Sequence, residues 1–128
     1  EVSRFYPQVV GDNPITVNVT TAERTFWEKV TIAHWIASSG KPIPPRYARH
    51  YYDIIMLTRA GVAAKAVADL PLLQAVVDFK QKFYWSKAAR YDQARPGTLR
   101  IVPGDEQLTE LERDYRNMEA MFYRPPPV

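Results

Sequence analysis

The sequence predicts a mainly α-helical domain of four to five helices, preceded by a short extended or β segment. After residue 20, apolar side chains recur at three- and four-residue steps, the period of an amphipathic helix. Glycines, prolines and capping residues separate these periodic stretches, as they do at helix ends. Before residue 20, β-forming residues such as Val9, Val10 and Val17 surround a Gly-Asp-Asn-Pro turn signal. With 128 residues, the chain is long enough to bury a core.

Residues 1–19 form the predicted extended lead-in. The run Ile15–Val19 alternates apolar and polar side chains, as a half-buried strand does. Two short strands are only marginally stable alone, so we expect them to pair with a sheet upstream of Glu1. The chain starts at Glu1 rather than at a methionine, which indicates processing or a fragment of a longer protein. Residues 20–128 form the predicted helical domain.

Capping residues and apolar periodicity predict where each helix lies. The expected helical stretches are residues 20–38, 45–60, 62–68, 69–83 and 105–122. A capping box at Thr20–Glu23 is expected to start the first, with the Thr20 hydroxyl accepting a hydrogen bond from the glutamate amide. Asp69 and Asp105 are expected to cap the last two.

The stretch 69–83 has an apolar face and a charged face. The predicted buried face consists of Leu72, Leu73, Val76, Phe79 or Lys80, and Phe83. Lys80 is also assigned, with Lys82, to the predicted solvent-exposed side, so it stands at the border of the two faces. The following residues, 86–104, are predicted to be irregular, with a turn at Pro96–Gly97 and a short extended segment at Thr98–Val102.

Composition excludes several classes of protein. The chain has no cysteine, so it has no disulfide, no thiol nucleophile and no cysteine-based zinc site. No apolar run approaches the roughly 18 residues of a membrane span, and no signal-peptide pattern opens the chain, which fits a cytoplasmic protein. The formal net charge of +3 and the pI of about 9.2 are compatible with nucleic-acid or nucleotide binding, although many other domains share them. His34 and His50 lack metal-ligand spacing, and no serine stands in a nucleophile motif.

Lys29 is the first candidate for a functional side chain. It follows Phe26 and Trp27 on the first predicted helix, at the edge of the apolar stripe. In one interpretation, its stem packs on that stripe while its ammonium group stays in water. In the other, it is a compact positive charge that binds a triphosphate. The residue pattern alone leaves both interpretations open.

Asp53 is the second candidate, and it ends a basic, aromatic run on the second predicted helix. By their spacing, Arg46, Arg49 and His50 share its helix face. Asp53 either forms a surface ion pair with Arg49, or it orients Lys29 or assists metal and nucleotide binding. Arg46 and Arg49 are candidate phosphate-binding residues beside Lys29.

A second basic set lies later in the chain and is a candidate for RNA binding. It consists of Lys80, Lys82, Lys87, Arg90, Arg95 and Arg100. The aromatic residues Phe83, Tyr84, Trp85 and Tyr91 are interleaved with it. Basic residues among aromatic ones bind RNA through phosphate contacts and base stacking. Alternatively, the aromatic residues belong to the core and the charges are merely solvated.

Several of these motifs together resemble the AbiEii/AbiGii-type nucleotidyltransferase toxins, the toxin component of type IV toxin–antitoxin systems. The motifs are Glu23–Lys29 (ERTFWEK), Arg49–Asp53 (RHYYD), Tyr91–Arg100, and Asp114-Tyr115 with Met118 and Met121. The resemblance covers roughly residues 15–125 and corresponds to the C-terminal half of the family.

The resemblance implies roles for individual residues and for partners. Lys29 would contact the nucleotide phosphates, and Asp53 would be needed for activity. Arg49 matches the arginine of the family motif, whereas His50 stands where the family often has an aspartate, which leaves the role of position 50 open. The full-length protein would use Mg²⁺ and an NTP, act on RNA, tRNA in the characterised cases, and be neutralised by a cognate antitoxin that is a DNA-binding repressor.

The chain lacks the Gly-Ser and paired-carboxylate motifs with which the family holds Mg²⁺. We therefore expect these residues to be the C-terminal portion of the enzyme, to bind neither Mg²⁺ nor an NTP tightly by themselves, and to be inactive alone. Residues 1–19 would then be the end of a missing nucleotidyltransferase core. The alternative is a non-catalytic helical module that binds nucleic acid or a protein partner through its basic aromatic face. The oligomeric state does not follow from the sequence.

Overall fold

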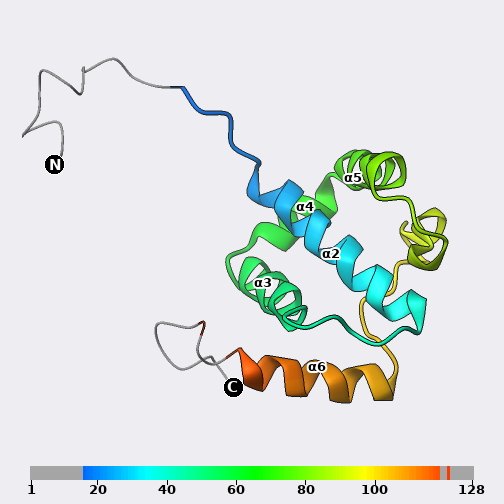
Figure 1. Ribbon diagram of the computed structural model, residues 1–128. Coiled ribbons are helices and arrows are strands. Elements are labelled where there is room, and N and C mark those ends of the chain that lie inside the picture. Colours follow the sequence, from blue (N-terminus) through cyan, green and yellow to red (C-terminus); the bar gives the residue numbers. More distant parts are fainter. Residues whose placement is uncertain (1–15, 119–120, 122–128) are drawn as a thin grey trace, which may run out of the picture.

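The computed structural model describes residues 16–118 and residue 121. Within these residues the chain is mainly helical, as predicted (Figure 1). The α-helices are α2 (Ala22–Ser39), α3 (Ala48–Arg59), α4 (Val62–Ala68), α5 (Leu70–Phe83) and α6 (Asp105–Asn117). Two 3₁₀ helices, η1 (Lys87–Ala89) and η2 (Tyr91–Gln93), lie in the segment between α5 and α6. Apart from these two short turns the segment has no regular secondary structure, as expected.

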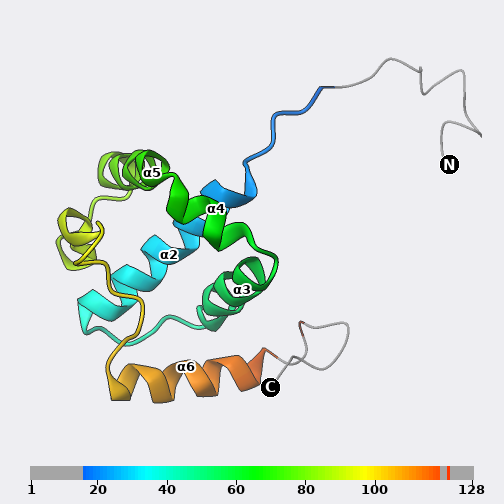
Figure 2. The same ribbon diagram turned by 180° about the vertical axis from the view of Figure 1, so that it is seen from behind.

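The central helix is α2, which contacts α3, α4, α5 and η1 (Figures 1 and 2). Its first turn is capped by Thr21, whose hydroxyl accepts a hydrogen bond from the Arg24 amide at 3.3 Å. The predicted cap at Thr20 was therefore one residue too early, because either threonine fits a capping position by sequence. The helix ends at Gly40, whose φ of 59° is the left-handed conformation that favours glycine.

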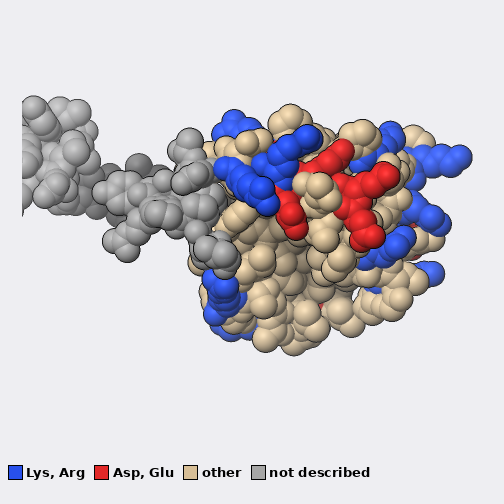
Figure 3. Space-filling view, turned by 90° about the horizontal axis from the view of Figure 1, so that it is seen from below, with Lys and Arg blue, Asp and Glu red and all other residues tan. Residues whose placement is uncertain are grey.

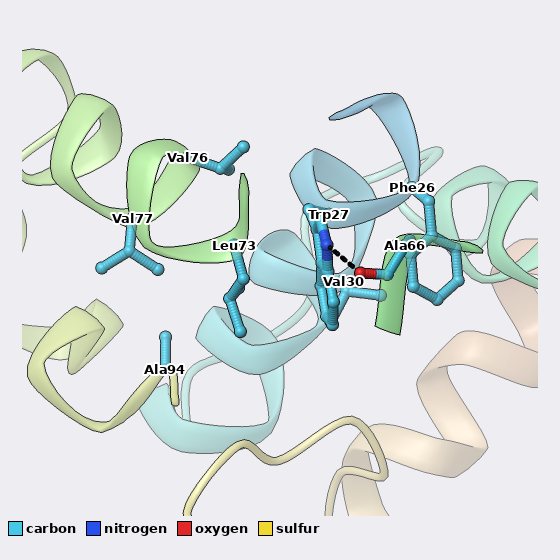
Figure 4. Packing of buried hydrophobic residues seen from close by; sticks show 8 residues of the cluster. All are labelled: Phe26, Trp27, Val30, Ala66, Leu73, Val76, Val77 and Ala94. Carbon is cyan, nitrogen blue, oxygen red and sulfur yellow. Dashed lines mark hydrogen bonds between the residues drawn. The ribbon is translucent and has the colours of Figure 1, made fainter. Parts of the chain in front are cut away.

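The main core forms where α2 meets α4, α5 and the segment after η2 (Figure 4). Its buried members are Phe26, Trp27, Val30, Ala66, Leu73, Val76, Val77 and Ala94. Full burial of a large apolar side chain contributes roughly 1.5–3 kcal/mol. The Trp27 indole donates a hydrogen bond to the Ala66 carbonyl at 3.2 Å, which satisfies its buried N–H and fixes α2 against α4.

Beyond Val77 the predicted burial of α5 is wrong. The helix is capped by Asp69 as expected. However, the side chains of Phe79 and Phe83 are 41% and 60% exposed, and they pack on each other with ring centroids 4.8 Å apart. Lys80, which the pattern assigns to both faces, is half-buried. Periodicity identifies one apolar face, but only packing neighbours decide how far along a helix that face is covered.

The predicted extended segments form no strand within the described residues. Residues 16–20 are unpaired, and the side chains of Val17 and Val19 are 69% and 85% exposed. Ile15 and the lead-in before it lie outside the described residues. Residues 98–102 are likewise not a strand, and Leu99 and Ile101 instead pack against the core. A strand needs a neighbouring strand for its backbone hydrogen bonds, and neither described segment has one.

A buried histidine holds the irregular segment against α2. The His34 side chain is fully buried. Its Nε2 lies 3.1 Å from the Arg90 carbonyl oxygen, and its Nδ1 lies 3.0 Å from the Arg100 amide nitrogen. These partners assign a donor at Nε2 and an acceptor at Nδ1. The imidazole thus supplies hydrogen-bond partners for two backbone groups that have none from regular secondary structure.

Helix α6 binds the last turn of α2, the linker that follows it and the start of α3 through three polar side chains. Gln107 donates to the Ile36 and Lys41 carbonyls, and the Glu110 carboxylate accepts from the Ile43 amide at 2.9 Å. The Asp114 carboxylate accepts hydrogen bonds from two backbone amides at the start of α3, those of Arg46 at 2.7 Å and Ala48 at 2.8 Å. The predicted Asp105 cap is wrong, because Gly104 is the N-cap and no side chain caps this helix.

Figure 3 views the molecule from the side on which α6 lies in Figure 1. Acidic side chains gather in one part of this face, and lysine and arginine side chains lie around them. On its inner side, α6 packs Leu111 and the following Met118 against Ala48 of α3. Phe122, at which the predicted helical stretch 105–122 ends, lies outside the described residues.

Candidate functional site

Two of the predicted site residues, Lys29 and Asp53, are brought together. Lys29 lies on α2 and Asp53 on the neighbouring helix α3. The lysine Nζ is 2.8 Å from the aspartate Oδ2, and the two side chains are 24% and 38% exposed. Asp53 therefore pairs with Lys29 rather than with Arg49 of its own helix. The lysine stem is partly covered, as expected for a residue at the edge of the apolar stripe.

His50 is the third member of this cluster. Its side chain is only 7% exposed, and its Nδ1 lies 3.5 Å from Lys29 Nζ. Burial, followed by the positive charges of Lys29 and Arg49, lowers the pKa of His50 to about 4. The imidazole is therefore neutral near pH 7. Because an ammonium group can only donate, Nδ1 must be the acceptor and Nε2 carries the proton.

The remaining predicted phosphate-binding residues lie beside this cluster rather than in it. Arg49 is exposed on α3, near enough to His50 to affect its pKa. Arg46 precedes α3 with an unusual φ of 68°, and its Nη2 lies 3.5 Å from Met121 Sδ. That contact directs the Arg46 guanidinium group toward the end of α6. Neither arginine contacts Lys29 among the interactions of the described residues.

A polar pocket of about 570 Å³ opens beside Lys29. Helix α2 and helix α5 contribute its charged groups, which are Glu28, Lys29 and Lys80. Its other lining residues are mostly aromatic or small: Ile32, Trp35, Tyr47, Phe79, Tyr84, Ser86, Ala89 and Tyr91. The combination of ammonium groups and aromatic rings suits a ligand that carries both negative charge and a flat ring.

The predicted RNA-binding set is exposed, apart from Lys80. Lys82 lies over the Phe83 ring at 5.3 Å, and Tyr84 and Trp85 beyond it are 64% and 76% exposed. The other members of the set are exposed as well, namely Lys87, Arg90, Arg95 and Arg100. The interpretation that these aromatic residues belong to the core is therefore wrong for Phe83, Tyr84 and Trp85, whereas Tyr91 is half-buried.

Two residues of the site were missed by sequence reasoning in different ways. The sequence drew attention to position 50 but not to its contact with Lys29, which lies 21 residues earlier. Lys80 was assigned to the solvent-exposed side of α5, yet it lines the same pocket as Lys29. Its position beside Phe79, on the border of the apolar stripe, was the one available signal.

The described residues contain no group of three or more His, Asp or Glu side chains arranged to hold a metal ion. Asp53 is a single carboxylate and is already engaged by Lys29. These residues therefore do not fit the Mg²⁺ site that the resemblance implies for the full-length protein. In the same part of the chain, none of the helices has the length and apolar character needed to cross a membrane.

A family model described as "Nucleotidyl transferase AbiEii toxin, Type IV TA system" matches residues 1–128, the whole chain. The chain belongs to the AbiEii nucleotidyltransferase toxin family. The comparisons with curated proteins and with solved structures each found no match. Membership of a type IV toxin–antitoxin family implies a cognate antitoxin as a partner.

Proposed function

We propose that this chain supplies Lys29 and Asp53 to the transfer of a nucleotide from an NTP onto an RNA acceptor, tRNA-like in kind. The single observation that supports this most directly is the 2.8 Å Lys29–Asp53 pair beside a polar pocket. The pair joins two helices through the two motifs in which the family resemblance is strongest. A cytoplasmic location and a role in bacterial defence, with a repressor antitoxin, belong to the same proposal.

The chemistry required of the protein is mainly electrostatic. Nucleotidyl transfer needs positive charge placed around the transferring phosphate and little covalent participation from side chains. Lys29 offers that charge as a compact ammonium group. Asp53 holds the ammonium group from one side, and the neutral His50 accepts a second hydrogen bond from it at 3.5 Å. One proton of the ammonium group is then left for a phosphate oxygen.

The Mg²⁺ requirement of the full-length protein remains part of the proposal. The described residues offer no group of three or more ligands for the ion. If carboxylates outside the described residues hold the ion, the role of this chain is to bind and orient the triphosphate. This division fits the expectation that the chain alone does not catalyse transfer.

A second function is favoured by the exposed aromatic residues at the end of α5. Phe83, Tyr84 and Trp85 are 60–76% exposed and are flanked by Lys82 and Lys87. Stacking of bases on such rings is a common way to bind single-stranded nucleic acid. A non-catalytic module that binds nucleic acid through this face is therefore the alternative.

Substitution of the pair tests the proposed function. In the natural protein that contains this chain, Lys29→Ala and Asp53→Ala should abolish growth inhibition. They should also lower nucleotide incorporation into RNA about 100-fold or more, because each removes a group that acts on the transferring phosphate. Circular dichroism should show unchanged helix content. Lys65→Ala, an exposed lysine on α4, is the matched control and should stay toxic.

The two proposed functions predict different results. If either Lys29→Ala or Asp53→Ala remains fully toxic, that residue is structural and its assignment fails. If both remain toxic while Trp85→Ala abolishes RNA binding, the nucleic-acid-binding module is the better description.

A further inference from the structure

Lys80 is a half-buried cation that faces the same pocket as Lys29. Its ammonium group has one hydrogen bond, to the Glu28 carbonyl oxygen at 3.4 Å, and forms no ion pair with a carboxylate of the described residues. A partly desolvated ammonium group with one long hydrogen bond has unused capacity for an acceptor, because it carries three donor protons. The open side of that group is the pocket.

The charges around Lys80 leave the pocket with an excess of positive charge. The carboxylate of Glu28 is engaged by Arg24 at 3.2 Å, and that of Asp53 is engaged by Lys29 at 2.8 Å. Burial lowers the pKa of Lys80, and the nearby charge of Lys29 lowers it further, while Glu28 opposes both. An anion bound between the two lysines would relieve this repulsion and restore the lost solvation.

The walls of the pocket narrow the class of anion. Trp35, Tyr47, Tyr84 and Tyr91 contribute aromatic surface, and the volume of about 570 Å³ lies in the range of sites for small organic ligands. Inorganic phosphate would use the lysines but not these rings. A nucleoside triphosphate uses both, since its phosphates bind the ammonium groups and its base packs on aromatic surface.

We propose that Lys80 is a second phosphate-binding residue, acting with Lys29 to hold the polyphosphate of a nucleoside triphosphate in this pocket. The identification of the ligand as a nucleoside triphosphate rests on the proposed function, whereas the anion site itself rests on the geometry. This assigns Lys80 a different ligand from that of the exposed basic residues that follow it. Those residues are candidates for RNA contacts, whereas Lys80 would contact the nucleoside triphosphate.

Calorimetric titration of the purified 128-residue chain with inorganic tripolyphosphate and with ATP at low ionic strength tests this proposal. Lys80→Met should weaken tripolyphosphate binding about tenfold or more, because a hydrogen bond to a charged group is lost. Lys80→Arg, which keeps the charge, should retain most of the affinity. Lys65→Met is the matched control, since it removes an exposed lysine on α4 that belongs to neither candidate site.

Each outcome decides the proposal. Weakened binding by Lys80→Met, with near-normal binding by Lys80→Arg and Lys65→Met, supports it. Equal affinity of Lys80→Met and the unmodified chain overturns it, and so does an equal loss in Lys65→Met, which would indicate non-specific charge attraction. Absence of tripolyphosphate binding by the unmodified chain also overturns it.

Two further measurements separate this inference from folding effects and from the proposed function. Thermal unfolding of Lys80→Met and Lys80→Gln establishes that the variants fold, and binding is compared only between folded chains. If Lys80→Met loses tripolyphosphate binding while Lys29→Ala remains toxic in the natural protein, the anion site stands and the proposed catalytic role fails. Stronger binding of ATP than of tripolyphosphate would support the aromatic walls as a base site.

Discussion

Two polar clusters in this molecule use carboxylates in opposite ways. On α6, Glu110 and Asp114 accept hydrogen bonds from backbone amides of the α2–α3 linker and of the start of α3. On α3, Asp53 binds the ammonium group at the end of the long Lys29 side chain, beside a pocket. The first arrangement satisfies main-chain donors that would otherwise lack partners. The second holds a charge in place without using all of its hydrogen-bonding capacity.

Under the proposed function, this difference separates a structural role from a functional one. A carboxylate that caps a helix has its acceptors filled by the fold, so its removal should mainly change the free energy of unfolding. A partly exposed ion pair contributes little stability, so its removal should mainly change function. The comparison can be tested by measuring stability and activity separately for residues of each cluster.

The largest expected effect on stability concerns His50. This residue belongs to the cluster beside the pocket, yet its burial means that it should also affect the free energy of unfolding, as the α6 cluster does. Its pKa is about 4 in the folded chain, against 6.5 for an ordinary histidine. The unfolded chain therefore binds the proton more tightly, and stability is retained above pH 6.5 and lost as the pH falls toward 4. The expected loss attributable to His50 at pH 4 is about 3 kcal/mol. Urea denaturation at several pH values measures it.

His50→Gln provides the control for this prediction. Glutamine cannot be protonated in this range, so the difference in stability between the two chains should shrink as the pH falls. The charged groups facing His50 are Lys29, Arg49, Lys80 and Asp53, and they are kept in the variant. An unchanged difference between pH 7 and pH 4 would contradict the lowered pKa.

Asp114→Ala should give the next largest effect. It removes two short hydrogen bonds, 2.7 and 2.8 Å, from the amides of Arg46, which precedes α3, and of Ala48, the first residue of α3. Loss of such a cap should lower the free energy of unfolding by about 2 kcal/mol, measured by urea denaturation at pH 7. Phosphate binding by the pocket should change only to the extent that the chain unfolds.

The matched control for Asp114 is Glu112→Ala on the same helix. Glu112 is exposed and has only a 4.0 Å contact with Arg116, so its removal should cost under about 0.5 kcal/mol. Equal effects of Asp114→Ala and Glu112→Ala would mean that the cap contributes no stability. The distinction between the two clusters would then fail on its structural side.

Much of the fold was predictable because its signals are local. The capping aspartate before α5, the glycine that ends α2 and the limits of α4 are each determined by neighbouring residues. The cap of α3 was not predictable, since it comes from Asp114, 66 to 68 residues away. The burial of Phe79 and Phe83 was predicted wrongly because periodicity does not reveal which elements cover a helix end.

For the candidate site, the sequence indicated Lys29 and Asp53 as candidates but did not indicate their environment. Lys29 and Asp53 stood out because charges within aromatic runs are costly to desolvate without partners. Their contact, and that of His50 with Lys29, depends on how α2 and α3 pack. Lys80 was missed because a lysine at the border of an apolar stripe faces water or a pocket according to the neighbouring helix. Only the three-dimensional arrangement distinguishes the two.

The smallest expected effect on stability is that of the Lys29–Asp53 pair itself. It tests most directly whether the two polar clusters differ in role. A double-mutant cycle with Lys29→Met and Asp53→Asn, measured by urea denaturation, should give a coupling energy of about 0.2–1 kcal/mol, since both side chains are partly exposed. The same substitutions should reduce growth inhibition by the natural protein strongly. A coupling energy above about 2 kcal/mol would mean that the pair stabilises the fold, as Asp114 is expected to do. Little stability and a large effect on activity would identify a charge that is held for a ligand.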